Sequence, residues 1–209
     1  MSAIFNHSAL VLLISWSSGI SLYLTVAIVG VCGRFGWLDL PSGLETLAHP
    51  VIIALAIIAY VVEFFADKVP WIDSAWDTVH TLVRPLGAAL LGFMAGIEFG
   101  GVAQTGMAVL SGAIAFDTHA LKASTRAAVN TSLEPFSNIA VSSAEDASVI
   151  GLFWLFIQYP LIASIVLVLL TIVTFLIVRK LWKFFIMIFK KPEIQEGRVE
   201  SGENSKKLE

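Results

Sequence analysis

Long apolar stretches, separated by short polar segments, dominate the sequence. Each is close to the roughly 19 residues that an α-helix needs to cross a hydrocarbon core of about 30 Å, so they predict transmembrane helices. Pro70 and Pro160 support two of the boundaries, because proline lacks a backbone N–H and suits the first turn of a new helix. The predicted spans are 9–31, 50–67, 77–98, 104–125, 139–158 and 161–187.

The two halves of the chain place their spans alike. With a shift of 89 residues, the spans of 9–98 fall on those of 99–187, and SGLETLAHP at 42–50 faces TSLEPFSNI at 131–139 with one Leu and one Glu shared. Three spans per half is an odd number, so the halves would have opposite orientations, as in many transporters and some channels. The sequence therefore predicts an all-α polytopic membrane protein with a 3+3 inverted repeat and short or broken polar helices.

The composition and the placement of positive charges agree with a membrane protein. The chain is 57% hydrophobic and 14% charged, and its mean hydropathy of +0.84 lies outside the usual soluble range. Lys and Arg cluster at the end of the last span and just beyond it, at 179–191, which predicts a cytoplasmic C-terminus and, through six spans, a cytoplasmic N-terminus. We expect a single transmembrane domain over 1–189, followed by a disordered cytoplasmic tail at 190–209, which is polar and lacks periodicity.

Charged residues interrupt the apolar pattern at VEFFADKVPWIDSAWDTVHTLVRP, residues 62–85. After Pro70, polar side chains recur at i, i+4, i+7 and i+11, which places them on one face of a helix. A second such stripe begins where the fourth span ends. The first stripe is Asp73, Asp77, His80 and Arg84, preceded by Glu63 and Asp67; the second region holds Asp117, His119, Lys122, Arg126, Asn130, Glu134, Ser137, Asn138, Glu145 and Asp146.

Two interpretations of these stripes stay open. A central Asp, Lys or Arg costs roughly 2.5–3.5 kcal/mol on insertion scales, so these groups should face one another, a water-filled cavity or the cytoplasmic interface. They are either paired charges at helix ends or the lining of a shared polar site. We favour a shared site, because the two clusters match in composition and spacing.

The residue types permit more than one ligand. Asp73, Asp77 and His80 could present oxygen and nitrogen atoms to a divalent cation, with other carboxylates nearby. Arg84 and Arg126, together with two lysines, could instead hold an anion or a lipid phosphate. Histidines change charge near neutral pH, which would allow proton coupling at His80 and His119. No other cofactor is indicated, and a divalent cation is the one candidate.

Small residues at 15–23, 87–96 and 106–115 predict close helix contacts and would also allow a homodimer. The sequence lacks the GxSxG, HExxH, Walker and CxxC patterns of soluble catalytic sites, so an enzyme is the least favoured class. The single cysteine, Cys32, cannot form an intrachain disulfide. We expect no nucleic-acid partner.

The segments EFFADKVPWIDSAWDTVHTLVRP, HALKASTRAAVNTSLEPFSN and SSAED resemble a bacterial membrane protein family known as domain of unknown function 4126. The resemblance covers about residues 10–185, and Leu133 departs from it where the family pattern has Pro. It implies an integral protein of the bacterial inner membrane with these polar segments as its hallmark, and it implies no activity.

The sequence as a whole favours a small transporter or channel-like protein that moves an ion or a small charged solute through a polar site between the repeats. Acidic residues outnumber basic ones in the clusters, so a cation is the favoured substrate. The alternative is a protein that binds lipid phosphates or assists membrane assembly without transport. The expected partners are the bilayer, the transported solute and a second copy of the chain.

Overall fold

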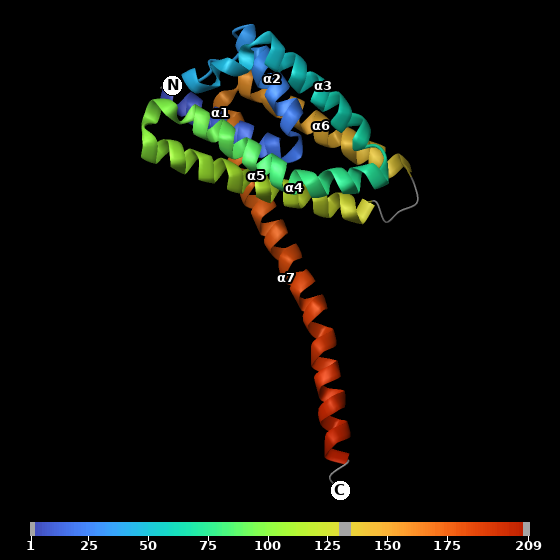
Figure 1. The fold of residues 1–209 in the computed structure, drawn as a ribbon. Helices are drawn as coiled ribbons and strands as arrows, with labels where there is room; N and C mark the ends of the chain where they lie inside the picture. The colour runs from blue at the N-terminus through green and yellow to red at the C-terminus, as the bar shows by residue number, and fades with distance from the viewer. Residues whose placement is uncertain (1–2, 130–134, 207–209) are drawn as a thin grey trace.

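The computed structural model describes the backbone of residues 3–129 and 135–206, and the side chains of 5–69, 71–129, 136–184 and 186–187. These residues fold as an all-helical protein, and the described ranges contain no strand (Figure 1). The helices are α1 (Ala3–Ile20), α2 (Leu22–Arg34), η1 (Ser42–Ala48), α3 (Pro50–Ala66), α4 (Pro70–Ala95), η2 (Ile97–Phe99), α5 (Gly101–Val129), α6 (Pro135–Gln158) and α7 (Pro160–Lys206).

Five of the predicted spans each overlap mainly with one α-helix, and α4 and α7 begin at the two prolines as predicted. The first predicted span, 9–31, is instead two helices that meet at Ser21. Ser21 has an extended backbone (φ −149°, ψ 105°), and its hydroxyl accepts a hydrogen bond from the Leu24 N–H, so it caps α2. Ser and Gly around this point favour caps and turns over helix interiors, which explains the break.

Three helices are long and apolar enough to cross a membrane: Trp71–Ala95, Phe136–Gln158 and Pro160–Phe184. A fourth candidate is the pair formed by η1 and α3, which is bent by 70°. The described part of the chain thus contains three to four candidate spans by length and composition, as a membrane protein requires.

Helices α4 and α5 form a long hairpin and lie side by side (Figure 1). Gly100, with φ +84°, supplies the left-handed backbone conformation between η2 and α5 that side chains disfavour. Along the hairpin the backbones approach closely: a Cβ built on Gly96 would lie 2.6 Å from the Gln104 Cα. The small-residue contacts predicted for these two helices are therefore present.

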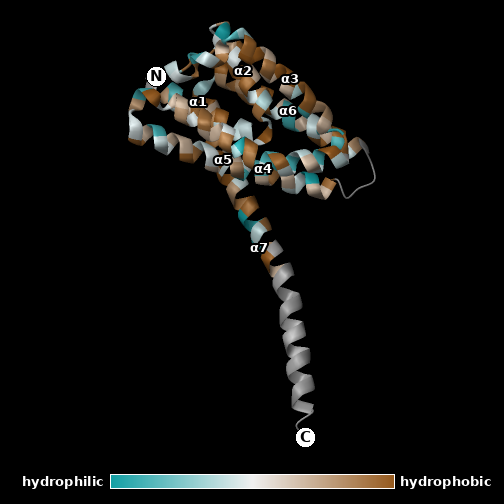
Figure 2. Cartoon of the chain, viewed as in Figure 1, coloured by the Kyte–Doolittle hydropathy of each residue, from teal (hydrophilic) through white to brown (hydrophobic). Residues whose placement is uncertain are grey.

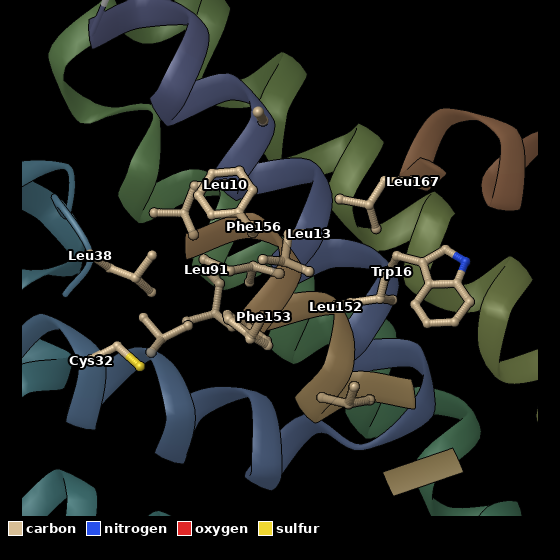
Figure 3. Packing of buried hydrophobic residues seen from close by; sticks show 14 of the residues in the cluster. Leu10, Leu13, Trp16, Cys32, Leu38, Leu91, Leu152, Phe153, Phe156 and Leu167 are labelled. Carbon is tan, nitrogen blue, oxygen red and sulfur yellow. The ribbon is translucent and has the colours of Figure 1, made fainter. Parts of the chain in front are cut away.

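The apolar core lies between α1, α6 and the first turns of α7, with contributions from α2 and α4 (Figure 3). Leu13, Phe153 and Leu167 are fully buried or nearly so. Lipid tails are as apolar as leucine, so inside a bilayer this core is stabilised by close packing more than by exclusion of water.

Helix α7 leaves the body of the molecule and extends away from it (Figure 1). Its buried residues Ala163, Leu167 and Thr174 all lie in its first four turns, and apolar side chains such as Phe175 are exposed beyond them. The structure continues this helix to Lys206, where the sequence predicted a disordered tail from residue 190. An existing helix extends at one hydrogen bond per added residue, and Glu, Gln and Lys are good helix formers, which favours the extension.

The distribution of side chains is inverted relative to a soluble protein. Val102 is 92% exposed and Trp71 is 88% exposed, whereas Arg84 is fully buried and Arg126 nearly so. Figure 2 shows hydrophobic positions predominating along α3, at the outside of the body. Large exposed apolar surfaces mark an interaction with lipid or protein, and buried charges require partners inside the fold.

Candidate functional site

The polar stripes of α4 and α5 face each other inside the bundle, together with the end of α3 and the beginning of α6. Their side chains would be costly to bury unless each were paired or hydrogen-bonded. The buried ionisable and amide side chains here are Glu63, Asp67, Asp73, Asp77, His80, Arg84, His119, Lys122, Arg126, Asn138 and Asp146, all at most 9% exposed.

One cluster is centred on Arg84 of α4. Its Nη2 donates to Glu63 Oε1 at 2.8 Å, and its Nη1 lies 3.3 Å from Asp77 Oδ1 and 2.8 Å from His119 Nδ1. A guanidinium only donates, so we assign Nδ1 of His119 as the acceptor and the ring proton to Nε2. Nε2 then faces the Thr81 hydroxyl at 3.1 Å, and His119 is neutral.

A second cluster lies one to two turns further along α5. Lys122 Nζ is 2.7 Å from Asp67 Oδ2 and 3.4 Å from Glu145 Oε2. Arg126 Nη2 contacts the same two carboxylates at 3.4 and 3.0 Å. Asn138 completes this cluster, because its side-chain oxygen accepts from Arg126 Nη1 and its amide donates to the Asp67 carbonyl at 3.0 Å.

The two clusters meet at the break between α1 and α2. The last carbonyls of a helix have no partner within the helix. Here Arg84 Nη1 lies 3.4 Å from the Gly19 carbonyl oxygen, and Lys122 Nζ donates to the Ile20 carbonyl at 3.1 Å. Cations are favoured at a helix C-terminus, so α1 ends on two positive charges that also serve the clusters.

The other side of the break receives a carboxylate. The Ser21 hydroxyl donates to Glu63 Oε2. Glu63 therefore lies at the N-terminus of α2, where negative charge is favoured. Gly19 allows this geometry, because a Cβ there would lie 2.5 Å from the Ala115 carbonyl oxygen and would separate α1 from α5.

Aromatic side chains border the clusters. His80 Nδ1 lies 2.8 Å from the Trp76 carbonyl oxygen, its Nε2 lies 3.3 Å from the Tyr23 hydroxyl, and its ring stacks on Trp76. The Tyr60 hydroxyl of α3 donates to Asp146 Oδ2 at 3.2 Å. One tyrosine of α2 and one of α3 thus contact charged or ionisable side chains of the network.

Not every predicted residue joins the clusters. Asp117 is half-buried, and its side chain forms no hydrogen bond or ion pair with any residue that the structure describes. It lies two positions from His119, and residues so spaced point to different sides of a helix. Ser137 is half-buried at the start of α6. Asn130 and Glu134 lie outside the described residues.

The divalent metal interpretation of Asp73, Asp77 and His80 is not supported by this arrangement. Among the described residues, no group of three or more His, Cys, Asp or Glu could hold a metal ion. Asp77 pairs with Arg84, Asp73 lies 3.9 Å from Arg126, and His80 is bound to the Trp76 carbonyl. The three side chains therefore share one helix face but contact three different groups.

Sequence reasoning missed several members of the network. The sequence could not indicate the Gly19 and Ile20 carbonyls as members of the network, because every residue has a backbone carbonyl oxygen. Ser21 had a signal in the polar run SWSSGIS, which we interpreted as a packing surface and which also breaks the span. Tyr60 had a signal, because it precedes Glu63 and Asp67 on the same face of α3, whereas Tyr23 lies among apolar residues of α2.

The fold and the buried network define an all-helical protein with membrane-length apolar helices around an ionic interior. The chain belongs to the family described as a domain of unknown function, number 4126, which it matches over residues 9–180. No curated protein and no solved structure matches the chain.

Proposed function

We propose that this protein is a membrane-embedded cation transporter or channel-like protein, in which the buried clusters bind the transported cation. The observation that carries the proposal is an excess of buried negative charge. Within the described residues, six carboxylates face four cationic side chains, so the formal charge is −2 with neutral histidines. The carboxylates are Glu63, Asp67, Asp73, Asp77, Glu145 and Asp146; the cations are Lys68, Arg84, Lys122 and Arg126.

An uncompensated charge in a low-dielectric interior is unstable. The excess must be neutralised by protons or by bound cations, and it repels anions. Asp67 Oδ1 and Asp77 Oδ2 are buried and have no hydrogen-bond partner among the residues that the structure describes, so each offers an oxygen to an incoming ion. Carboxylate oxygens are the donors that hard cations prefer.

In the proposed membrane arrangement, α1 and α2 together form the first of six spans, and the halves of the chain form the 3+3 inverted repeat. The shared spacing of the spans in the sequence supports the repeat. The break at Ser21 supports a transporter, because discontinuous helices form ion sites in many transporters. Both termini lie in the cytoplasm of a bacterium, since Arg179, Lys180 and Lys183 follow the last apolar run.

We expect His119 to couple proton binding to cation binding. Its neutral ring lies between Arg84 and Thr81. When a cation enters beside Asp77, the pair of Asp77 and Arg84 weakens, and the position of the guanidinium relative to His119 changes. Protonation of His119 would repel Arg84, so this ring is placed to link proton binding to the opening of the ion pair.

The alternative, binding of lipid phosphates without transport, has less support. Arg84, Lys122 and Arg126 are at most 3% exposed, and each one already contacts carboxylates. A phosphate would have to displace those carboxylates and would add negative charge to an interior that has an excess of it.

The proposal is tested by the thermal stability of the detergent-purified protein against alkali cations, divalent cations, phosphate compounds and anionic lipids at equal ionic strength. A ligand that binds only the folded state raises Tm. We expect a cation to raise Tm in the wild type and to lose this effect in Asp77→Asn and His80→Ala. Asp117→Asn is the matched control, because Asp117 lies outside the clusters.

The pattern of ligands separates the two functions. A rise with anionic lipid alone, abolished by Arg126→Ala, would favour the lipid-binding alternative. Binding and flux that remain intact in Asp77→Asn and His80→Ala, for every ion tested, would reject the transporter.

A further inference from the structure

The oxygens around the Lys122 ammonium resemble the ligands of a bound alkali cation. Nζ lies 2.7 Å from Asp67 Oδ2, 3.1 Å from the Ile20 carbonyl oxygen and 3.4 Å from Glu145 Oε2. One backbone carbonyl and two carboxylates form a set of oxygen donors typical of hard cations. Ammonium and K⁺ are similar in size, so the same oxygens suit either ion.

We propose that the α1–α2 break, Asp67 and Glu145 form a binding site for a monovalent cation, which Lys122 occupies in this structure. The Lys122 side chain is then a tethered competitor: a free cation binds when the ammonium moves away, and is released when the ammonium returns. The inference rests on the proposed function and names its ligand class.

The local charge selects a monovalent ion. When Lys122 moves away, Asp67 and Glu145 lose one positive charge and keep their contacts with Arg126 at 3.4 and 3.0 Å. One monovalent cation restores that single charge, whereas a divalent ion would exceed it by one in a buried site.

Two independent observations support a site rather than a simple ion pair. The Ile20 carbonyl belongs to the unpaired end of α1, so its oxygen needs a donor or a cation. Asp67 is 3% exposed and its Oδ1 has no hydrogen-bond partner in the described part of the chain, so the site retains an unused carboxylate oxygen. Unwound carbonyls of discontinuous helices coordinate Na⁺ or protons in transporters.

The test is to vacate the site and refill it from solution. Lys122→Ala, purified in choline chloride, should gain thermal stability when NaCl, KCl, ammonium or methylammonium chloride replaces choline at equal ionic strength. The expected rise in Tm is about 3–5 °C at ten times the Kd. Wild-type protein should show a much smaller rise, because its own ammonium fills the site.

Two further variants serve as controls. Lys183→Ala should behave as the wild type, because Lys183 is an exposed lysine of α7 that lies outside the clusters. The double variant Lys122→Ala/Asp67→Asn should lose the cation effect, because it lacks one of the two carboxylates that would bind the cation.

Lys122→Gln keeps a hydrogen-bond donor of similar length and provides a second route if Lys122→Ala folds poorly. The same cation-dependent rise is expected for it. The proposal is overturned if neither variant responds to cations, if all proteins respond equally, or if neither variant folds in choline or in KCl.

Different experimental results would reject the cation site and the transport function. Cation-dependent stability of Lys122→Ala, together with no cation flux through the wild type, would retain the site and reject transport. Flux through the wild type without any cation effect on Lys122→Ala and Lys122→Gln would reject the site alone.

Discussion

The two halves of the α4–α5 hairpin are held together by opposite means. Near the connection, glycines bring the backbones together: a Cβ on Gly92 would lie 2.6 Å from the Met107 carbonyl oxygen. At the other half, polar side chains join the two helices: Arg84 Nη1 lies 2.8 Å from His119 Nδ1. Pro85 lies inside α4 where one half gives way to the other, and removes one hydrogen bond of that helix.

This difference indicates which half can rearrange. Close glycine packing has one low-energy arrangement, because any shift loses contacts or produces overlap. The ionic half retains buried atoms, such as Asp77 Oδ2 and Arg84 Nε, that have no hydrogen-bond partner within the described ranges, so alternative pairings are available to it. We therefore regard the glycine half as the scaffold and the ionic half as the part that changes during function.

We expect the largest loss in the free energy of unfolding when a cation of the ionic half is removed. Arg84→Met leaves Glu63 and Asp77 buried without their cation, and removing one partner of a buried pair costs about 3–5 kcal/mol. Chemical unfolding in detergent measures this loss. Arg34→Met is the control and should change the free energy of unfolding by less than about 0.5 kcal/mol, because Arg34 is exposed.

Adding Glu63→Gln and Asp77→Asn to Arg84→Met should recover part of the lost stability, because the unpaired charges are then gone. If the triple variant is as unstable as Arg84→Met, the loss arises from packing around the guanidinium and not from charge.

Overfilling the glycine half should have a smaller effect. Gly92→Val forces side-chain atoms against the Met107 carbonyl and Ser111, and overpacking costs about 1–3 kcal/mol. The free energy of unfolding reports the loss. Gly106→Ala on α5 has open space around it and should stabilise the protein by up to about 1 kcal/mol through helix propensity. Equal losses in both variants would contradict close packing at Gly92.

Ser21 lies at the break between α1 and α2, where it caps α2 and contacts Glu63. Ser21→Ala removes the cap of α2 and the hydrogen bond to Glu63, and should cost about 1–2 kcal/mol. Ser164→Ala is the control, because that hydroxyl bonds only to the Pro160 carbonyl of its own helix. A similar effect of both substitutions on thermal stability would argue against a special role for Ser21.

The smallest effect is expected at the connection itself, where Glu98 accepts from the Ser42 N–H at 2.8 Å. The pKa of Glu98 lies below its ordinary value of 4.5, because of the Ser42 backbone and hydroxyl and the nearby His7. A lowered carboxyl pKa gives stability above pH 4.5 that is lost as the pH falls through the folded-state value. Glu98→Gln should flatten this acid dependence of Tm, and an unchanged acid dependence would rule out the contact.

The regular features of the fold followed from the sequence. Proline predicted where α4 and α7 begin, and the small-residue runs predicted the close approach of α4 and α5. The i, i+3, i+7 spacing correctly placed Asp77, His80 and Arg84 on one buried face. Local rules suffice for these features, because helix periodicity fixes which residues share a face.

The partners of each charge did not follow from the sequence. Asp73, Asp77 and His80 share a face, yet the crossing of α4 with its neighbours directs each to a different group. The sequence did not predict the break at Ser21, because helix propensities are weak and tertiary contacts decide whether a run of Ser and Gly continues as a helix. Lys122 and Arg84 stabilise this break from positions about 100 and 65 residues away.

The most direct test of the central claim is cation flux in vesicles that contain the purified protein. The ionic interior carries excess negative charge, so the wild type should conduct or exchange at least one monovalent cation and exclude chloride. Asp77→Asn should reduce this flux at least tenfold, and Asp117→Asn should leave it unchanged. Flux of anions instead of cations, or equal cation flux in Asp77→Asn and wild type, would contradict the account.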